Sequence, residues 1–165
     1  MITIRRGHQK DIHIISEILI DTWQKSYKSF IPQEFLKNLN LEQQMSRHKI
    51  YMDGGTSYFV AENDKNEAVG FASFGKNRIQ KVKSEIELYT IYVSCNHHGK
   101  GIGTKLLSRI YNELNNNIDS IVVSVFEENP YKDFYIKNGF EKIDEEVVDL
   151  GVLQLEGGIY RKWIS

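Results

Sequence analysis

A glycine-rich stretch in the middle of the chain limits its fold more than any other feature. The stretch runs from Ser94 to Lys105 and has glycines at positions 99, 101 and 103. The mostly apolar segment Ile86–Val93 precedes it and is typical of a strand, and apolar residues at helical spacing follow over about 101–114. Glycines let the backbone turn tightly with φ > 0, and the first N–H groups of a helix have no partner inside it. The stretch therefore predicts a strand–turn–helix unit that binds phosphate or diphosphate.

The spacing of these glycines excludes the two common nucleotide-binding loops. A dinucleotide-binding loop needs G-x-G-x-x-G, but Thr104 or Leu106 occupies the last position, depending on which glycine pair begins the motif. A P-loop needs Gly-Lys followed directly by Ser or Thr, and the sequence has no such run. The phosphate ligand is therefore expected to belong to another class.

Two segments, His98–Gly103 and Asn129–Phe140, carry the most specific patterns. The first is similar to [Gln/Arg]-x-x-Gly-x-[Gly/Ala], the pyrophosphate loop of the GNAT superfamily of acyl-CoA-dependent N-acyltransferases, with His98 in place of Gln or Arg. The second resembles the N…FY…GF segment of that family and follows at the usual distance. The resemblance implies one N-acetyltransferase domain over residues 1–165, with acetyl-CoA as co-substrate.

The periodicity of apolar and turn residues predicts a mixed α/β (α+β) order. Strands are expected at 2–5, 56–62, 68–74, 85–93, 120–126, 140–148 and 153–163. Helices are expected at about 12–27, 34–39, 41–52, 101–114 and 130–139. The resemblance implies a mixed, mostly antiparallel central sheet of about seven strands, flanked by four to five helices. Residues 75–84 are expected to form a flexible loop near the acceptor end.

The composition restricts the partners of the chain. Its 21 basic and 22 acidic side chains leave a net charge of −1, which argues against a nucleic-acid-binding face. Cys95 is the single cysteine, so no internal disulfide forms and a reducing compartment fits. No apolar run approaches the ~20 residues of a membrane helix, and no secretory segment is recognisable. We expect a cytoplasmic protein without membrane or nucleic-acid partners.

The resemblance also implies which residues hold the cofactor. The backbone of Ile91, Tyr92 and Val93 is expected to hold the pantetheine arm and to polarise the thioester carbonyl. Asn129 is expected to hydrogen-bond the same arm. The diphosphate is expected to lie on the loop residues His98, Gly99, Lys100, Gly101, Ile102, Gly103 and Thr104.

Catalysis of amine acylation requires a base, because an amine of pKa ~10.4 is protonated at neutral pH. Alternation along the central strand puts Glu85 and Glu87 on one face, with Glu87 as first choice and Glu85 as second. The alternative is that both are solvated residues of a half-buried strand. Tyr135 matches the tyrosine that the family places near the sulfur as general acid. A phenol of pKa ~10 is expected to act there mainly as a hydrogen-bond donor to the thiolate.

The acceptor is less well specified. Trp23 and Tyr27 resemble the first helix pair of the family, which lines the acceptor site, although core packing also explains Trp23. A polyamine, a small amine or a peptide or protein amine all fit. The acidic run Asp144–Asp149 could attract a polycation or simply be a solvated strand face.

Other functions receive less support from the sequence. A non-catalytic acyl-CoA-binding or regulatory module is the main alternative, and a nucleotide-dependent transferase is a weaker one. Adjacent His97 and His98 point apart and have no further ligand at a suitable spacing, so we expect no metal site. Cys95 has no evident base partner as a nucleophile. Exposed edge strands near the C-terminus would allow a homodimer.

Overall fold

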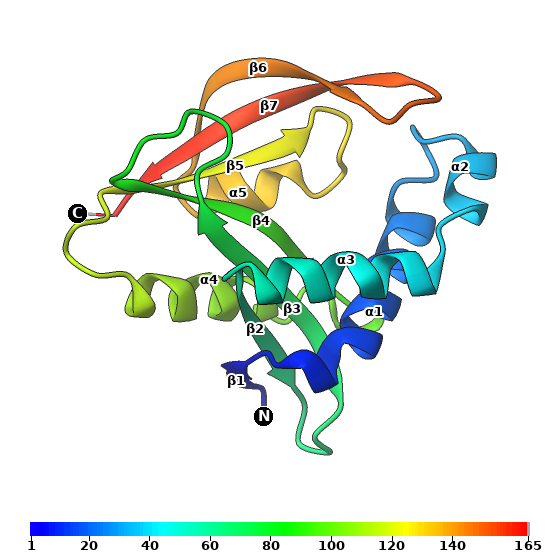
Figure 1. Cartoon of the computed structure of the whole chain (residues 1–165), viewed down its shortest axis with the longest axis horizontal. Coiled ribbons are helices and arrows are strands. Elements are labelled where there is room, and N and C mark those ends of the chain that lie inside the picture. Colours follow the sequence, from blue (N-terminus) through cyan, green and yellow to red (C-terminus); the bar gives the residue numbers. More distant parts are fainter. Residues whose placement is uncertain (165) are drawn as a thin grey trace. The chain divides into compact units, whose positions relative to one another are not determined.

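The computed structural model describes residues 1–164, which form seven β-strands and five α-helices in the predicted order (Figure 1). The strands are β1 (Thr3–Arg6), β2 (Ser57–Glu62), β3 (Ala68–Lys76), β4 (Glu85–Val93), β5 (Ser120–Phe126), β6 (Glu141–Asp149) and β7 (Gln154–Trp163). The helices are α1 (Ile12–Ser26), α2 (Gln33–Lys37), α3 (Leu41–Asp53), α4 (Ile102–Glu113) and α5 (Lys132–Lys137). Short 3-10 turns at Gln9–Asp11 and Cys95–His97 complete the regular structure. The expected α/β fold is confirmed.

The strands are hydrogen-bonded in the order β1-β2-β3-β4-β5-β7-β6. The pairs β1–β2, β2–β3, β5–β7 and β6–β7 are antiparallel, whereas β4 and β5 run parallel. A parallel pair needs a crossover connection, and the segment between β4 and β5 contains the glycine loop and α4. The sheet is therefore mixed and mostly antiparallel, as expected.

The chain divides into two compact units, and β4 contributes to both. Unit 1 consists of residues 1–75 and 90–113, and unit 2 of residues 76–89 and those from Leu114 onward. Unit 1 thus contains the glycine loop and helices α1 to α4. Unit 2 contains Glu85 and Glu87 at the start of β4, together with β5, α5, β6 and β7. The single domain expected over residues 1–165 stays a prediction.

Strand β2 in unit 1 is buried on both faces. Tyr58 packs with Phe71 of β3 and with apolar residues of α1. Phe59 points to the opposite face, because side chains alternate along a strand. The Arg109 guanidinium of α4 lies 4.7 Å from the centroid of the Phe59 ring. Helices α1 and α4 therefore cover opposite faces of β2.

Local signals in the sequence set several element ends. Asn40 caps α3, since its Oδ1 accepts the N–H of Gln43 at 3.0 Å. Gly139 follows α5 with φ of +90°, the conformation expected after a helix. Strand β3 continues to Lys76, two residues beyond its expected end at Phe74. Within residues 1–164, each helix is too short or too polar to cross a bilayer.

His48 of α3 is buried in unit 1, and its side chain faces Tyr58. Nδ1 of His48 lies 2.8 Å from the Tyr58 hydroxyl, and burial lowers the pKa of His48 to about 4. Among residues 1–164, none pairs with its buried Nε2. A charged imidazole is therefore disfavoured in the folded state.

We expect acid to destabilise the fold through His48. Between pH ~6.5 and about 4 the unfolded chain binds a proton that the folded chain does not, so stability falls as the pH drops through this window. The free energy of unfolding is expected to decrease by up to ~3 kcal/mol. Urea unfolding between about pH 7 and pH 4.5 measures the slope. His48→Gln, which keeps a hydrogen-bonding group beside Tyr58, should flatten it, and the exposed His13→Gln should not. Equal slopes in all three proteins would contradict this assignment.

Candidate active site

The glycine loop of unit 1 turns through two residues in the left-handed region. Gly99 and Gly101 both have φ of +74°, and within residues 1–164 no atom beyond the adjoining residues lies within 4 Å of the position a Cβ would take at either glycine. Conformation rather than crowding therefore requires glycine here. The first hydrogen bond of α4 runs from the Lys105 N–H to the Gly101 carbonyl at 3.0 Å. The amides of 101–104 lie at the positive end of the helix dipole, where an anion is favoured.

His98 ties this loop to the end of β4. Its Nε2 lies 2.6 Å from the Val93 carbonyl oxygen. A carbonyl only accepts, so Nε2 carries the proton and donates it. The side chain of His98, a residue expected to contact the diphosphate, thus makes a contact within the protein. His98 is well placed to hold the loop relative to Val93.

The last residues of β4 are half-buried and contact α1 and β3. The Tyr92 hydroxyl accepts a hydrogen bond from Trp23 Nε1–H at 3.0 Å, and the rings of Trp23 and Tyr27 meet edge-on at 5.1 Å. Burial raises the pKa of Tyr92, while hydrogen bonds from Trp23 and Tyr27 partly offset the rise. A Cβ at Gly70 would lie 2.9 Å from the Tyr92 carbonyl oxygen, so β3 and β4 approach closely here. The two predicted acceptor residues are therefore brought together with Tyr92.

A cavity of about 540 Å³ lies beside α1 in unit 1. Its polar lining includes Glu17, Asp21 and Gln24, and Leu39 and Leu41 contribute apolar surface. The first helix pair does border a cavity, but Trp23 and Tyr27 do not line it.

Glu85 of unit 2 is buried, and its carboxylate accepts hydrogen bonds from several surrounding residues. One oxygen accepts Ser120 Oγ–H and Arg161 Nε–H, both at 2.5 Å, and the other accepts Asn77 Nδ2–H at 2.9 Å. A second bond from Arg161, at 3.2 Å, completes the arrangement. Its carboxylate thus accepts hydrogen bonds from three segments, which are strand β5, strand β7 and the loop that follows β3. The expectation that Glu85 could be a solvated residue is wrong.

Glu87 is equally buried, but its carboxylate is held by one residue. Oε1 accepts the backbone N–H of Arg78 at 2.9 Å and its Nε–H at 3.2 Å, and Oε2 accepts its Nη2–H at 2.8 Å. The guanidinium also lies 4.0 Å from the centroid of the Tyr89 ring. The side chain of Glu87 is 4% exposed and that of Arg78 is 58% exposed. The buried carboxylate is therefore covered by a side chain that reaches water.

An Asn-centred turn places Arg78 over Glu87. Asn77 Oδ1 accepts the N–H groups of Ile79 at 2.9 Å and Gln80 at 3.1 Å. This pattern turns the chain sharply after β3. The Tyr89 hydroxyl donates to the Lys76 carbonyl at 2.6 Å, which ties the start of the turn to β4. The expected flexible loop therefore begins with an ordered, hydrogen-bonded segment over 77–80.

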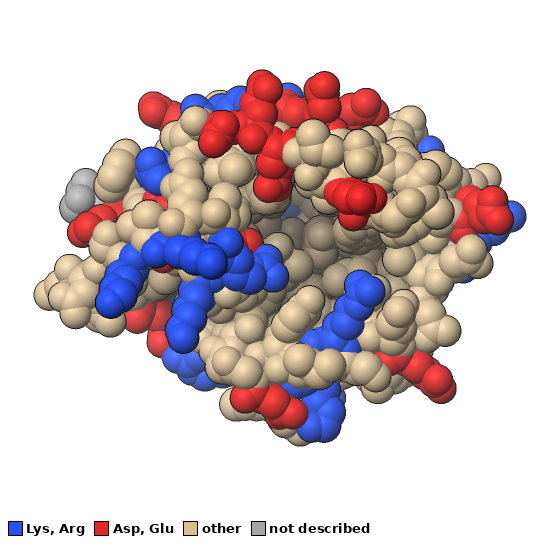
Figure 2. Space-filling model, turned by 45° about the horizontal axis from the view of Figure 1, so that its top comes forward, with Lys and Arg blue, Asp and Glu red and all other residues tan. Residues whose placement is uncertain are grey.

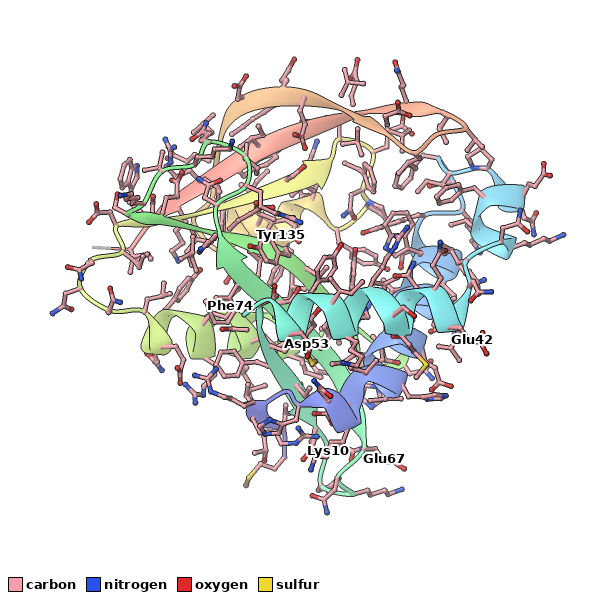
Figure 3. All side chains as sticks on the ribbon, in the orientation of Figure 1. Lys10, Glu42, Asp53, Glu67, Phe74 and Tyr135 are labelled. Atoms are coloured by element: carbon pink, nitrogen blue, oxygen red, sulfur yellow. The ribbon has the colours of Figure 1, made fainter. Side chains whose placement is uncertain are left out.

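Tyr135 projects from α5 in unit 2 and is 9% exposed (Figure 3). Its ring meets Phe134 edge-on at 5.3 Å and Phe140 at 5.8 Å. Asn129 precedes α5, and its Oδ1 accepts the N–H of Tyr131 at 2.8 Å. One polar atom of Asn129 thus shapes the turn before α5.

A known protein family matches the part of the chain that contains these features. The model of the acetyltransferase (GNAT) domain family matches residues 20–156, a range that includes the glycine loop, both β4 carboxylates and α5. The chain belongs to the GNAT acetyltransferase family. A curated relative, the uncharacterized N-acetyltransferase YuaI of Bacillus subtilis (strain 168), is 31% identical over 157 residues, covering 94% of this chain and 90% of YuaI.

Solved structures of GNAT proteins share the fold. The paiA N-acetyltransferase of Thermoplasma acidophilum, in complex with coenzyme A, has a TM-score of 0.77 at 20% identity and 99% coverage of both chains. The yncA protein of Salmonella typhimurium, with its cofactor acetyl-CoA, has a TM-score of 0.72 at 20% identity and covers 100% of this chain and 95% of its own. These likenesses confirm the GNAT-like sheet and helices.

Sequence reasoning missed the partners of the β4 carboxylates. Arg78 lies in a segment that lacks periodicity, and Arg161 is 76 residues from Glu85 along the chain. The alternation along β4 was the one signal in the sequence that both carboxylates face the same neighbouring segment. Strand pairing explains the partners of Glu85. Ser120 of β5 is opposite Glu85, and Val122, two residues further along β5, is opposite Arg161 of β7.

Two remaining predictions concern charged groups. No set of three or more His, Cys, Asp or Glu side chains in the described chain is arranged to hold a metal. The acidic run of β6 is exposed, and Asp and Glu gather along the upper part of the molecule in Figure 2. Lys142 bridges Glu127 at 2.8 Å and Glu145 at 2.9 Å, so part of this charge is neutralised within unit 2.

Proposed function

We propose that this GNAT acetyltransferase transfers an acetyl group from acetyl-CoA to a primary amine by direct attack of the amine on the thioester. The glycine loop carries the proposal: two residues with φ of +74° open directly into the N-terminus of α4. This arrangement supplies backbone N–H donors and a positive helix end for a diphosphate. The paiA and yncA structures, solved with coenzyme A and acetyl-CoA, support the same ligand here.

Different residues of the chain bind the cofactor and assist the acetyl transfer. The loop amides of 99–104 bind the diphosphate, and Lys100 adds positive charge. Backbone groups of Ile91–Val93 hold the pantetheine arm, together with Asn129. One N–H aimed at the thioester oxygen stabilises the developing negative charge by about 3–4 kcal/mol. The Tyr135 hydroxyl donates a hydrogen bond to the departing thiolate.

Glu87 is the better candidate for the general base. Glu85 accepts hydrogen bonds from three residues, and each would lose a buried partner if the carboxylate turned to an acceptor. Glu87 is uncovered by the movement of one largely exposed side chain, Arg78, whose backbone N–H still holds Oε1. A general base must come within hydrogen-bond reach of the amine, and Glu87 can do so once the Arg78 side chain moves.

Coenzyme A binding followed by an acceptor screen tests the function. Isothermal titration with coenzyme A should give saturable binding. Release of free thiol from acetyl-CoA should depend on an amine in a panel of phenethylamine, spermidine, lysine and a peptide with a free α-amino group. Binding without amine-dependent thiol release from any member would favour a non-catalytic acyl-CoA-binding module. Absence of binding would overturn the proposal.

Gly101→Ala is expected to weaken coenzyme A binding about tenfold. An alanine at φ of +74° costs ~1–2 kcal/mol of strain, which the loop relieves by leaving the binding conformation. Gly151→Ala is a matched control, since Gly151 has φ of +86° and equally open surroundings but lies in the β6–β7 turn. Titration calorimetry should find an unchanged affinity for that control. Equal affinities in both variants would remove the loop as the diphosphate site.

A further inference from the structure

We propose that Arg78 is a specificity-determining residue that a cationic acceptor displaces from Glu87. The guanidinium occupies, in the free protein, the place on the carboxylate that a protonated amine takes when it binds. The inference rests on the proposed role of Glu87 as base. It adds a requirement for positive charge on the incoming acceptor and an exchange step before proton transfer.

The contacts of Glu87 make such an exchange possible. Among residues 1–164, Arg78 donates every hydrogen bond that the Glu87 carboxylate accepts. The two side-chain bonds from Arg78 to Glu87 can break by rotation of an arginine that is 58% exposed, while the Arg78 backbone N–H keeps Oε1 in place. A guanidinium that leaves Glu87 remains close to water and to the Tyr89 ring. Movement of the Arg78 side chain away from Glu87 therefore costs little in itself. The larger cost is a Glu87 carboxylate left without a cation, and an incoming cation removes that cost.

The charge balance favours a cation as the replacement. A buried carboxylate without a positive partner is strongly disfavoured, so a neutral molecule cannot take the place of Arg78 at equal cost. An ammonium group brings one positive charge and N–H donors, as the guanidinium does. It then transfers one proton to Glu87, which leaves a neutral amine and a neutral carboxyl group. That carboxyl group no longer attracts Arg78 until its proton is lost to water.

Within residues 1–164, Glu87 forms an ion pair with Arg78 and with no second cation. From β4 itself, Tyr89 and Glu85 are the titratable neighbours, and neither is positive. On β5 the residue opposite Glu87 is Val122. Arg161 of β7 is bound to Glu85 through Nε at 2.5 Å and to Gln80 at 2.7 Å. Arg161 is therefore fixed on the neighbouring carboxylate and serves as an internal reference.

Arginine Nε–H signals in a ¹⁵N NMR spectrum report the exchange directly. The Arg78 signal is assigned by its loss in Arg78→Lys, and the Arg161 signal by its loss in Arg161→Lys. With the protein saturated in coenzyme A, addition of the most active amine of the panel should move the Arg78 signal towards that of a solvated arginine. The Arg161 signal should stay, and 1-butanol at the same concentration should move neither. An Arg78 signal unaffected by an amine that the enzyme acetylates would overturn the proposal.

Steady-state kinetics provide the second test. If Arg78 covers Glu87 in about nine molecules of ten, Arg78→Gln lowers KM for a cationic amine about tenfold. Arg78→Lys should restore KM towards the wild-type value. Lys83→Gln, which removes an exposed charge from the same loop, should leave KM unchanged.

The outcomes separate this inference from the proposed function. If Glu87→Gln is inactive while Arg78→Gln keeps the wild-type KM, Glu87 stands as base and Arg78 is only structural. If Glu87→Gln keeps full activity, or if no amine releases coenzyme A, the proposed role of Glu87 fails and this inference fails with it.

Discussion

Glu87→Gln is expected to lower kcat by a factor of about 10²–10⁴ at neutral pH. The amide cannot accept a proton from the acceptor ammonium, and the neutral amine is scarce when its pKa is ~10.4. The rate should recover as the pH rises towards the pKa of the amine, since free amine then forms without a base. Thiol release from acetyl-CoA over a pH series measures both effects.

The fold should tolerate this change. Glutamine retains an oxygen for the backbone N–H of Arg78, and the exposed guanidinium can turn to water. Loss of the ion pair is expected to cost ~1 kcal/mol or less. Wild-type turnover by Glu87→Gln at neutral pH would remove Glu87 as base, and unchanged coenzyme A affinity would show that the variant is intact.

Glu85→Ala is expected to lower the free energy of unfolding by ~3–5 kcal/mol. The substitution leaves Ser120 and Asn77 without the acceptor that they share in the interior, and it leaves the Arg161 guanidinium without its buried carboxylate. Unsatisfied buried donors and an unpaired charge are among the most costly defects in a core. Urea unfolding of the wild type and of Glu85→Ala measures the loss, and the dependence of the unfolding free energy on urea concentration is compared between the two proteins.

A double-mutant cycle distinguishes the ion pair from general packing. Arg161→Ala in the Glu85→Ala background should cost much less than Arg161→Ala alone, since the two residues share one interaction. Additive losses would mean that the pair contributes little. The two neighbouring glutamates thus have opposite expected phenotypes: Glu85 affects stability and Glu87 affects turnover.

The conformation of the glycine loop in the candidate site was predictable from the sequence. Gly99 and Gly101 adopt the positive φ that glycine permits, and α4 begins directly after them. The alternation of β4 correctly placed Glu85 and Glu87 on one side, where both meet residues of the loop after β3. The role of His98 was not predictable, because nothing in the motif indicates that its ring donates to the Val93 carbonyl.

The sequence by itself determined the order of elements, the glycine turn and the family of the chain, because each depends on residues close together along the chain. Only the tertiary structure showed that Glu85 is held by three residues and Glu87 by one exposed arginine. That difference arises from Arg161 and Ser120, which strand pairing brings to Glu85, and from the exposed Arg78, which the Asn77 turn brings to Glu87. Contacts between distant segments depend on register and burial, and alternation along a single strand cannot specify them.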